Sequence, residues 1–498
     1  MERNANIGST MLADERIYRY NPWWGRSGWE ADDPHLRRLR VRPVRLPAPQ
    51  VDEVDLMRAA VHILRGPRQV GKSTDLKLLV SRALREGVAP RGVVYLSLDL
   101  LEDQPAAELV ATVERALELA GDGKKGTRLV LLDEVTAARS WRTSIKSLWD
   151  DGLLDRDVVI CTGSSAIDLA EGAAERLPGR RGAGRDMLVL PQSFAAFARA
   201  CSPDGLPPGP GLTVGELLSD DGRAALLDAR VHLPMLRVAL ERYLLFGGLP
   251  AAVVEAASGL PEPSEEVQRL LWDSLAREVQ RRGASMPAAH ALLERIVRSL
   301  GAKVSWSRIA RELGVPLGSG ARRPGGEAND PRTVQSYVEL LAVNYFALIL
   351  YFWKGDAGSG DLAKDKKLYF GDPLLYTIAT TRSGLPRDRH AEVENALALA
   401  LYRRYEPAEH SAEGFRAPER LHVWGTRRGG EIDFVCGPRE AIEAVEVADW
   451  ATVNRQKATA PMRALPGRPA LVATREELRF SPTANLVPAA LLLWALSG

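Results

Sequence analysis

One short segment constrains this chain more than any other. The residues from Gly66 to Ser73 read Gly-Pro-Arg-Gln-Val-Gly-Lys-Ser, which fits the pattern G-x-x-x-x-G-K-[ST]. An apolar run precedes them at 61–64, and a segment with helical spacing follows at 76–84. In such a setting the glycines let the chain turn tightly, backbone N–H groups face a phosphate, and the helix N-terminus adds a positive dipole end. The sequence therefore predicts a phosphate-binding loop between a strand and a helix.

The side chains of this loop predict ATP and Mg²⁺ as its ligands. Lys72 would reach the β- and γ-phosphates, and Ser73 would hold Mg²⁺. The whole loop is expected to contact the nucleotide, through Gly66, Pro67, Arg68, Gln69, Val70, Gly71, Lys72, Ser73 and Thr74.

A second strand-like run ends in two acids. Residues 129–132 are continuously apolar and are followed by Asp133 and Glu134. Strands that are buried on both faces of a parallel sheet have this composition. Asp133 is predicted to bind Mg²⁺, and Glu134 to polarise the water that attacks ATP. The alternative is a buried strand that meets a solvated acidic turn, but the loop upstream favours nucleotide hydrolysis.

Strand and helix patterns alternate over residues 51–200, which predicts an α/β core with a parallel sheet flanked by helices. Ligands of such sheets bind at the carboxyl ends of the strands, where the polar motifs lie. The other expected parts are an N-terminal leader or strap at 1–50, a helical lid at 212–300, a winged helix at 301–385 and a smaller α/β domain at 390–498.

The composition excludes several classes of protein. Lys plus Arg number 66 and Asp plus Glu number 64, so the net charge of +2 indicates no polyanionic partner, and any nucleic-acid contact must come from local patches. Cys161, Cys201 and Cys436 lie far apart, which argues against a disulfide framework or a zinc site. No run of 18 apolar residues is present, and the N-terminus lacks a signal-peptide core, so we expect a cytoplasmic protein without membrane contact.

Residues 304–315 and 331–341 resemble the two helices of a helix-turn-helix, followed by strand-like runs that would form a wing. Basic residues in the second helix, in the loop before it and around the wing tip are candidates for phosphate or base contacts. The alternative is a module used only for internal packing. The expected nucleic-acid contacts are Arg322, Arg323, Arg332, Gln335, Lys366 and Lys367.

The C-terminal part resembles the PD-(D/E)xK nuclease core. Asp433 and Glu446 occupy the acidic positions on two expected strands, with Glu394 as a further acid, and would form a second metal site. The lysine position holds Ala448, which argues against cleavage, although Lys457 is a possible substitute. The favoured interpretation is a degenerate nuclease-like fold that serves binding or assembly, and the alternative is an ordinary hairpin with unrelated acids.

The ordered set of motifs resembles AAA-type ATPases of the archaeal-ATPase and STAND-like branch. The set comprises the phosphate loop, Leu-Leu-Asp-Glu-Val at 131–135, Cys-Thr-Gly-Ser-Ser-Ala at 161–166, Leu-Pro-Gly-Arg at 177–180, Leu-Pro-Gln-Ser-Phe at 190–194 and Tyr-Leu-Leu-Phe-Gly-Gly-Leu-Pro at 243–250. The resemblance implies a C-terminal winged helix and a restriction-endonuclease-like domain.

The same resemblance implies roles for further residues. Thr162 or Ser164 would sense the γ-phosphate, and Arg180 or Arg185 would act as an arginine finger towards a neighbouring subunit. Gly248 and Pro250 would contribute to the nucleotide pocket.

The sequence therefore predicts a Mg²⁺-dependent ATPase that couples its nucleotide state to remodelling of DNA, with branched or single-stranded DNA favoured. A homo-oligomer is expected, with a ring and a hexamer favoured. The alternatives are a nucleotide-dependent signalling switch that acts on protein partners, and a defence or toxin–antitoxin-like module with an active C-terminal nuclease.

Overall fold

The computed structural model of the chain divides into two compact units. The first runs to Leu190 and the second begins at Pro191. The residues that the structure describes are 14–99, 106–121, 127–138, 141–163, 184–202, 205–281, 285–313, 317, 329–354, 359–406, 417–425, 431–438, 442–447, 470–482 and 484–498.

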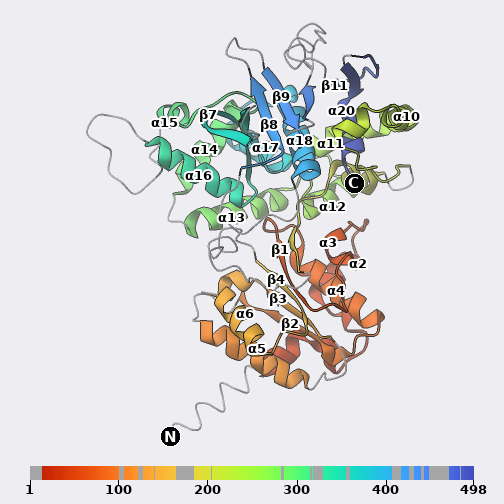
Figure 1. Cartoon of the computed structure of the whole chain (residues 1–498), viewed down its shortest axis with the longest axis vertical. Helices are drawn as coiled ribbons and strands as arrows, with labels where there is room; N and C mark the ends of the chain where they lie inside the picture. Colours follow the sequence, from red (N-terminus) through yellow and green to blue (C-terminus); the bar gives the residue numbers. More distant parts are fainter. Residues whose placement is uncertain are drawn as a thin grey trace. The chain divides into compact units, whose positions relative to one another are not determined.

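Five parallel strands form the sheet of the first unit, in the order β2-β3-β4-β1-β5 (Figure 1). The apolar runs seen in the sequence become strands that are buried along almost their whole length, as expected for a sheet covered on both faces. The strands are β1 (Ala60–Arg65), β2 (Val93–Ser97), β3 (Leu129–Asp133), β4 (Val158–Thr162) and β5 (Asp186–Leu188).

Helices flank this sheet and complete a P-loop type α/β fold, which confirms the predicted fold class of the core. Helix α4 contacts β2 and β3, and helix α5 contacts β2 and α6. The helices of this unit are α2 (Pro34–Arg40), α3 (Pro49–Asp52), α4 (Lys72–Arg85), α5 (Ala106–Ala120) and α6 (Trp141–Asp150).

The aromatic segment before α2 packs on β2, the edge strand of the sheet. The indole Nε1 atoms of Trp23 and Trp24 both donate to the carbonyl of Val93, at 2.9 and 2.8 Å. The Asn21 amide donates to the carbonyl of Tyr95 at 2.9 Å and accepts from its N–H at 2.7 Å. An exposed edge strand invites pairing with another chain, so this N-terminal segment protects β2 as a further strand would.

Replacing Asn21 with alanine is expected to destabilise the first unit by about 2–4 kcal/mol, because two buried backbone groups of Tyr95 lose their partner. Urea unfolding followed by tryptophan fluorescence would measure the change. Glu15→Ala, at an exposed position of the same segment, should have little effect. Equal stabilities of the two variants would show that Asn21 does not hold the edge.

A separate mixed sheet of seven strands forms the framework of the second unit, in the order β12-β11-β10-β9-β8-β6-β7. The pairs β6–β8, β10–β11 and β11–β12 are parallel, and β6–β7, β8–β9 and β9–β10 are antiparallel. The strands are β6 (Ala347–Lys354), β7 (Ser359–Phe370), β8 (Leu421–Gly425), β9 (Glu431–Cys436), β10 (Glu443–Val447), β11 (Ala470–Thr474) and β12 (Ala484–Pro488).

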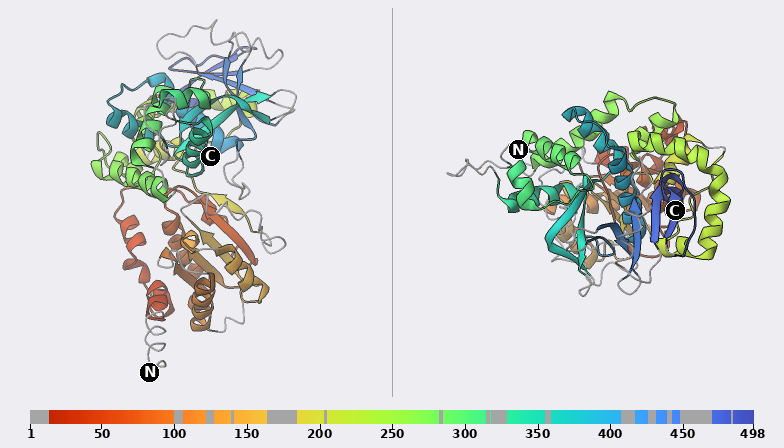
Figure 2. Two further views of the ribbon diagram at one scale, coloured as in Figure 1. Left: turned by 90° about the vertical axis from the view of Figure 1, so that its left-hand side faces the viewer. Right: turned by 90° about the horizontal axis from the view of Figure 1, so that it is seen from above.

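Helices pack around this second sheet, and α18 contacts β7, β8, β9 and β10 along the middle of it (Figure 2). No helix among the described residues is long and apolar enough to cross a membrane. The helices are α8 (Phe194–Cys201), α9 (Val214–Leu218), α10 (Asp220–Asp228), α11 (Leu233–Phe246), α12 (Pro250–Ala257), α13 (Glu265–Arg281), α14 (Met286–Arg298), α15 (Trp306–Glu312), α16 (Pro331–Val343), α17 (Pro373–Ser383), α18 (Arg389–Tyr405) and α20 (Ala489–Leu496).

The strands expected to form a wing do not stand alone. The hairpin β6–β7 follows α15 and α16 as predicted, but β6 also pairs with β8, so the hairpin is one edge of the seven-stranded sheet. The parts expected at 301–385 and 390–498 therefore share a sheet. Local sequence patterns do not predict this pairing, because β7, α17 and α18 lie between β6, which ends at Lys354, and β8, which begins at Leu421.

Candidate functional site

The loop between β1 and α4 is shaped by its glycines. A Cβ atom on Gly66 would lie 2.2 Å from the carbonyl oxygen of Val189, so a side chain there would force the backbone to move. Gly71, directly before α4, has φ of 109°, which favours glycine. Gln69 also adopts a left-handed conformation, with φ of 66°. The strand, loop and helix predicted from the sequence are therefore present, and the loop leads into the N-terminus of α4.

Lys72, the first residue of α4, points back into the loop. Its Nζ donates to the carbonyls of Gly66 at 2.9 Å and Pro67 at 3.0 Å, and the side chain is 5% exposed. Burial lowers the pKa of Lys72, while the charges of Glu134 and Asp133 act against that shift. The ammonium is thus held inside the loop, and the acids at the end of β3 are close enough to act on it.

Three neighbouring strands fix the carboxylate of Asp133. This residue ends β3 and is 3% exposed. Its Oδ1 accepts from the hydroxyl of Thr162 at the end of β4, and its Oδ2 accepts from the hydroxyl of Tyr95 in β2 at 2.9 Å. Burial and the charge of Asp133 raise the pKa of Tyr95, so the phenol stays protonated and remains a donor. The carboxylate is therefore oriented before any ligand binds.

Glu134 has an unusual backbone conformation. Its φ of 56° is left-handed, and such conformations of residues other than glycine gather at functional sites. Its N–H donates to the hydroxyl of Thr162 at 3.2 Å. The hydroxyl of Thr162 therefore contacts the carboxylate of Asp133 and the backbone N–H of Glu134. Ser164, the other predicted sensor, lies outside the described residues.

Residues of the N-terminal segment reach the same region, which the sequence did not suggest. The ammonium of Lys77 lies 3.4 Å from the ring centroid of Tyr95 and 3.8 Å from a carboxylate oxygen of Asp33. Burial lowers the pKa of Lys77 to about 8, against the charge of Asp33. The Nδ1 of His35 lies 3.3 Å from the hydroxyl of Thr74, the last residue of the predicted loop. The segment before β1 thus contacts the helix that starts at the loop.

Of the two predicted arginine fingers, Arg180 lies outside the described residues. Arg185 lies directly before β5, and its backbone N–H donates to Nδ1 of His62 at 3.2 Å. Its guanidinium lies 3.8 Å from Glu53. Since β5 runs parallel to β1, this register places Arg185 beside the middle of β1 and away from the carboxyl end, where the phosphate loop begins.

Gly248 and Pro250 lie in the second unit. The N–H of Gly248 donates to Oδ2 of Asp372 at 2.8 Å, and its carbonyl accepts from the N–H of Gln192 at 2.6 Å. Burial raises the pKa of Asp372 to about 6, although its hydrogen bonds oppose the shift. Pro250 is the first residue of α12. These contacts give Gly248 a structural role within the second unit. The contribution of Gly248 and Pro250 to the nucleotide pocket stays a prediction.

The residues of the predicted helix-turn-helix differ in their surroundings. Helices α15 and α16 are present and in contact, but Arg322 and Arg323 lie outside the described residues. Arg332 is exposed in the first turn of α16, and its N–H is capped by Asp330. The Gln335 amide donates to Glu339 on the next turn of the same helix, at 2.8 Å. Of the two described residues in α16, Arg332 is thus the more exposed, and its contact with a nucleic acid stays a prediction.

The predicted position of Lys366 and Lys367 around an exposed wing tip is wrong. Lys366 is 2% exposed and Lys367 is 1% exposed, although both lie on β7, the edge strand of the larger sheet, because other parts of the second unit cover their side chains. The Lys366 ammonium lies 4.2 Å from the ring centroid of Trp306 and 5.5 Å from that of Tyr351. Burial lowers the pKa of Lys366 to about 8.

The ammonium of Lys367 binds the acids that the sequence assigned to a second metal site. It lies 3.0 Å from Glu394, 2.8 Å from Asp433 and 2.8 Å from Glu431. Glu446 joins this group through its Oε2, which accepts from the N–H of Asp433 at 3.2 Å. We call these five residues the Lys367 cluster.

Within the described residues, no group of three or more His, Cys, Asp or Glu side chains is arranged to hold a metal ion. An internal ammonium, that of Lys367, lies 2.8 Å from Asp433, and the second metal site at Asp433 and Glu446 stays a prediction. Ala448 and Lys457 lie outside the described residues.

The Lys367 cluster predicts a pH effect on stability. Burial, followed by the charge of Asp433, raises the pKa of Glu446 from 4.5 to about 9. Between these pH values the folded chain holds a proton that the unfolded chain releases, so the free energy of unfolding falls as the pH rises through this window. Glu446→Gln removes this dependence and should be more stable than the wild type at about pH 9, with a smaller difference at about pH 5. Urea unfolding at both pH values measures the free energy of unfolding. If this free energy falls by the same amount between about pH 5 and pH 9 in Glu446→Gln and in the wild type, the prediction is contradicted.

The comparisons with known proteins agree with the geometry of the first unit. A loop that holds a lysine at a helix N-terminus, beside a strand that ends in two acids, defines a P-loop nucleotide-binding type of domain. Residues 58–198 match the family described as AAA domain. Residues 237–385 match a family described as a domain of unknown function (DUF8612). No curated protein matches the chain.

Several solved structures resemble the chain weakly. The ORC2 protein of Aeropyrum pernix, in ADPNP and ADP complexes, is 12% identical, with coverage of 66% of this chain and 89% of that one and a TM-score of 0.34. The ORC1 protein of Aeropyrum pernix in complex with DNA is 14% identical, with coverage of 72% and 93% and a TM-score of 0.27. AMPPCP-bound DnaA from Aquifex aeolicus is 14% identical, with coverage of 62% and 88% and a TM-score of 0.24. At such scores the likeness supports no functional conclusion.

Proposed function

We propose that the first unit binds and hydrolyses ATP with Mg²⁺. The observation that carries this proposal is the buried Lys72 ammonium inside a glycine-shaped loop, beside the fixed carboxylate of Asp133. The carbonyls of Gly66 and Pro67 hold the ammonium where phosphate oxygens would replace them. Such a change exchanges two neutral acceptors for charged ones, and hydrogen bonds between charged groups are about twice as strong.

The residues of the loop and of β3 fit a magnesium nucleotide. Ser73 follows Lys72 in the first turn of α4, and Asp133 presents a buried carboxylate at the end of β3, so a hydroxyl and a carboxylate are available as oxygen ligands. The metal would neutralise charge on the phosphates. Thr162 keeps Asp133 oriented and holds the backbone of Glu134, which we assign as the group that polarises the attacking water. Thr162 and Ser164 remain the candidate sensors of the γ-phosphate.

Hydrolysis is expected to be completed between subunits of a homo-oligomer. Because Arg185 lies beside the middle of β1, it is better suited to a neighbouring subunit's nucleotide than to its own. A guanidinium there would neutralise charge on the transferred phosphoryl group. Arg180 is the other candidate, and a ring, with six subunits favoured, is the assembly that we propose in the presence of ATP. We keep the cytoplasm as the expected compartment.

We further propose DNA, in branched or single-stranded form, as the target of the ATPase. The supporting feature is the order α15, α16 and hairpin, with Arg332 exposed at the start of α16. The burial of Lys366 and Lys367 removes two of the predicted phosphate contacts, so the surface depends on Arg332 and on the predicted contacts at Arg322 and Arg323.

The test measures ATP hydrolysis with single-stranded, branched and duplex DNA at low and high salt. We expect stimulation of several-fold, weakened by salt because phosphate contacts release counterions. Arg332→Glu should reduce it, whereas Arg269→Glu, at a 70% exposed side chain of α13, should leave it unchanged. A rate of ATP hydrolysis that none of these DNAs changes would favour the alternative of a nucleotide-dependent switch that acts on protein partners.

A nuclease in the C-terminal part remains the less favoured alternative. The ammonium of Lys367 lies against three carboxylates, so a metal ion would first have to displace it. Labelled DNA incubated with Mn²⁺ or Mg²⁺ tests this alternative. Cleavage by the wild type that is lost in Asp433→Ala would establish nuclease activity and favour the hypothesis of a defence or toxin–antitoxin-like module.

A further inference from the structure

Exposed apolar side chains, called the stripe below, lie along α10, the 3-10 helix η7 (Ala229–His232) and α11 of the second unit. Four of the seven large apolar side chains that are exposed in the described residues lie here, at positions spaced three or four residues apart. They are Leu227, Val231, Met235 and Val238, with exposed fractions of 51, 73, 36 and 64%. Isolated exposed apolar residues are normal, but four within twelve residues of the chain call for a partner.

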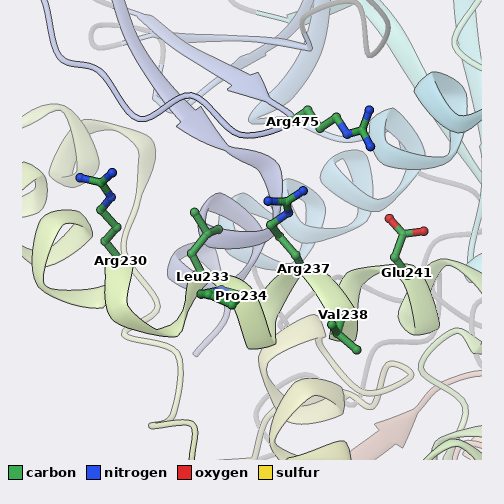
Figure 3. A pocket seen from close by; sticks show the side chains of 7 residues that line it. All are labelled: Arg230, Leu233, Pro234, Arg237, Val238, Glu241 and Arg475. Carbon is green, nitrogen blue, oxygen red and sulfur yellow. The ribbon is translucent and has the colours of Figure 1, made fainter.

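A groove with charged ends accompanies the stripe. Its volume is about 640 Å³, and its lining includes Arg230, Val238, Glu241 and Arg475. Figure 3 shows Arg230 at one end of the helical stretch and Glu241 at the other. Among the described residues, the Arg230 side chain has no hydrogen-bond or ion-pair partner, and the Glu241 side chain is 66% exposed beside Arg389. The two ends thus carry opposite charges, of which the Glu241 carboxylate already forms an ion pair with Arg389.

The charges are placed symmetrically about the middle of the stripe. Arg230, in η7, lies five residues before Met235, and Glu241, in α11, lies six residues after it, so the two charges are nearly equidistant from Met235 in the sequence. In an antiparallel contact between two copies of this stretch, related by a two-fold axis near Met235, Arg230 of each copy would lie opposite Glu241 of the other copy. The same axis would bring Val231 near Val238 of the second copy and cover the apolar positions.

We propose that this face binds a second copy of the chain in an isologous, antiparallel contact of the stretch from Leu227 to Glu241. A self-complementary patch of this kind is what a two-fold dimer uses. The contact needs no nucleotide and is separate from the ATP-dependent ring, so it stands or fails independently of the proposed ATPase.

The first test measures the mass of the full chain by analytical ultracentrifugation without nucleotide. The wild type should sediment as a dimer at micromolar concentrations, and Val231→Glu with Val238→Glu should weaken the dimer at least about tenfold, because two charges would be buried per copy. Val41→Glu is the matched control, since Val41 is 81% exposed outside the stripe. Thermal unfolding confirms that each variant is folded, and the milder pair Val231→Ser with Val238→Ser should act in the same direction.

The second test separates a second copy from any other partner. Arg230→Glu alone and Glu241→Arg alone should each weaken the dimer, because like charges then meet twice. An equimolar mixture of the two variants should restore it, because each interface then pairs an arginine with a glutamate. A monomeric wild type, an unchanged mass in the valine variants, or a mixture that stays monomeric would overturn the proposal.

Discussion

Replacing Glu134 with glutamine is expected to lower the rate of ATP hydrolysis by about 10²–10⁴-fold while ATP still binds. Glutamine keeps the size of the side chain and removes the carboxylate that would polarise the attacking water. The backbone N–H of residue 134 would still donate to Thr162, so Asp133 and the loop should keep their geometry. The loss should therefore fall on kcat, with little change in the affinity for ATP.

This prediction is measured as steady-state phosphate release together with equilibrium binding of ATP. Glu86→Gln is a matched control, because Glu86 is an exposed glutamate just after α4 that pairs only with Arg82 among the described residues. The Glu134 variant should also retain ATP and favour the assembled state. Normal turnover in Glu134→Gln would show that another group activates water.

Replacing Lys367 with methionine is expected to destabilise the second unit by about 3–5 kcal/mol. Methionine fills a similar volume but removes the ammonium that lies against Glu394, Asp433 and Glu431. Glu431 keeps the ammonium of Lys303 at 3.0 Å, but Glu394 and Asp433 lose the ammonium that compensates their charge, and removal of one partner from a buried charged group is costly. Chemical unfolding at neutral pH measures the loss.

The neighbouring lysine provides the control for this second prediction. Lys366 is equally buried but faces the rings of Trp306 and Tyr351, so Lys366→Met should cost much less than Lys367→Met. Adding Glu394→Gln to Lys367→Met should recover part of the stability, because one uncompensated carboxylate disappears. Equal losses in the two lysine variants, or no recovery in the double variant, would mean that the cluster contributes through packing alone.

The phosphate loop and its strands were predictable because their signals are local. Gly66, Gly71 and Lys72 are close in sequence, and the apolar run before Asp133 marks a buried strand by itself. The partners of these residues were not predictable. Tyr95 and Thr162 bind Asp133 only because β2 and β4 both neighbour β3, and strand order cannot be deduced from local periodicity.

The second unit shows the same limit more strongly. Asp433 and Glu446 were identified as a pair of acids, yet their cation comes from Lys367, which lies 66 residues before Asp433. Lysines near a predicted hairpin tip are usually exposed, and no local pattern indicates that β6 and β7 belong to a larger sheet. The location of the acids could thus be predicted, whereas the burial and pairing of the lysines could not.

The most direct measurement of the central claim is calorimetric titration of the purified chain with ATP and Mg²⁺, compared with the Lys72→Ala variant. The wild type should bind ATP saturably, and the variant should bind about 10- to 100-fold more weakly, because it lacks the ammonium that meets the phosphates. A folded wild-type chain that takes up no nucleotide at millimolar ATP, or a Lys72→Ala variant that binds equally well, would contradict the assignment of this loop as the nucleotide site.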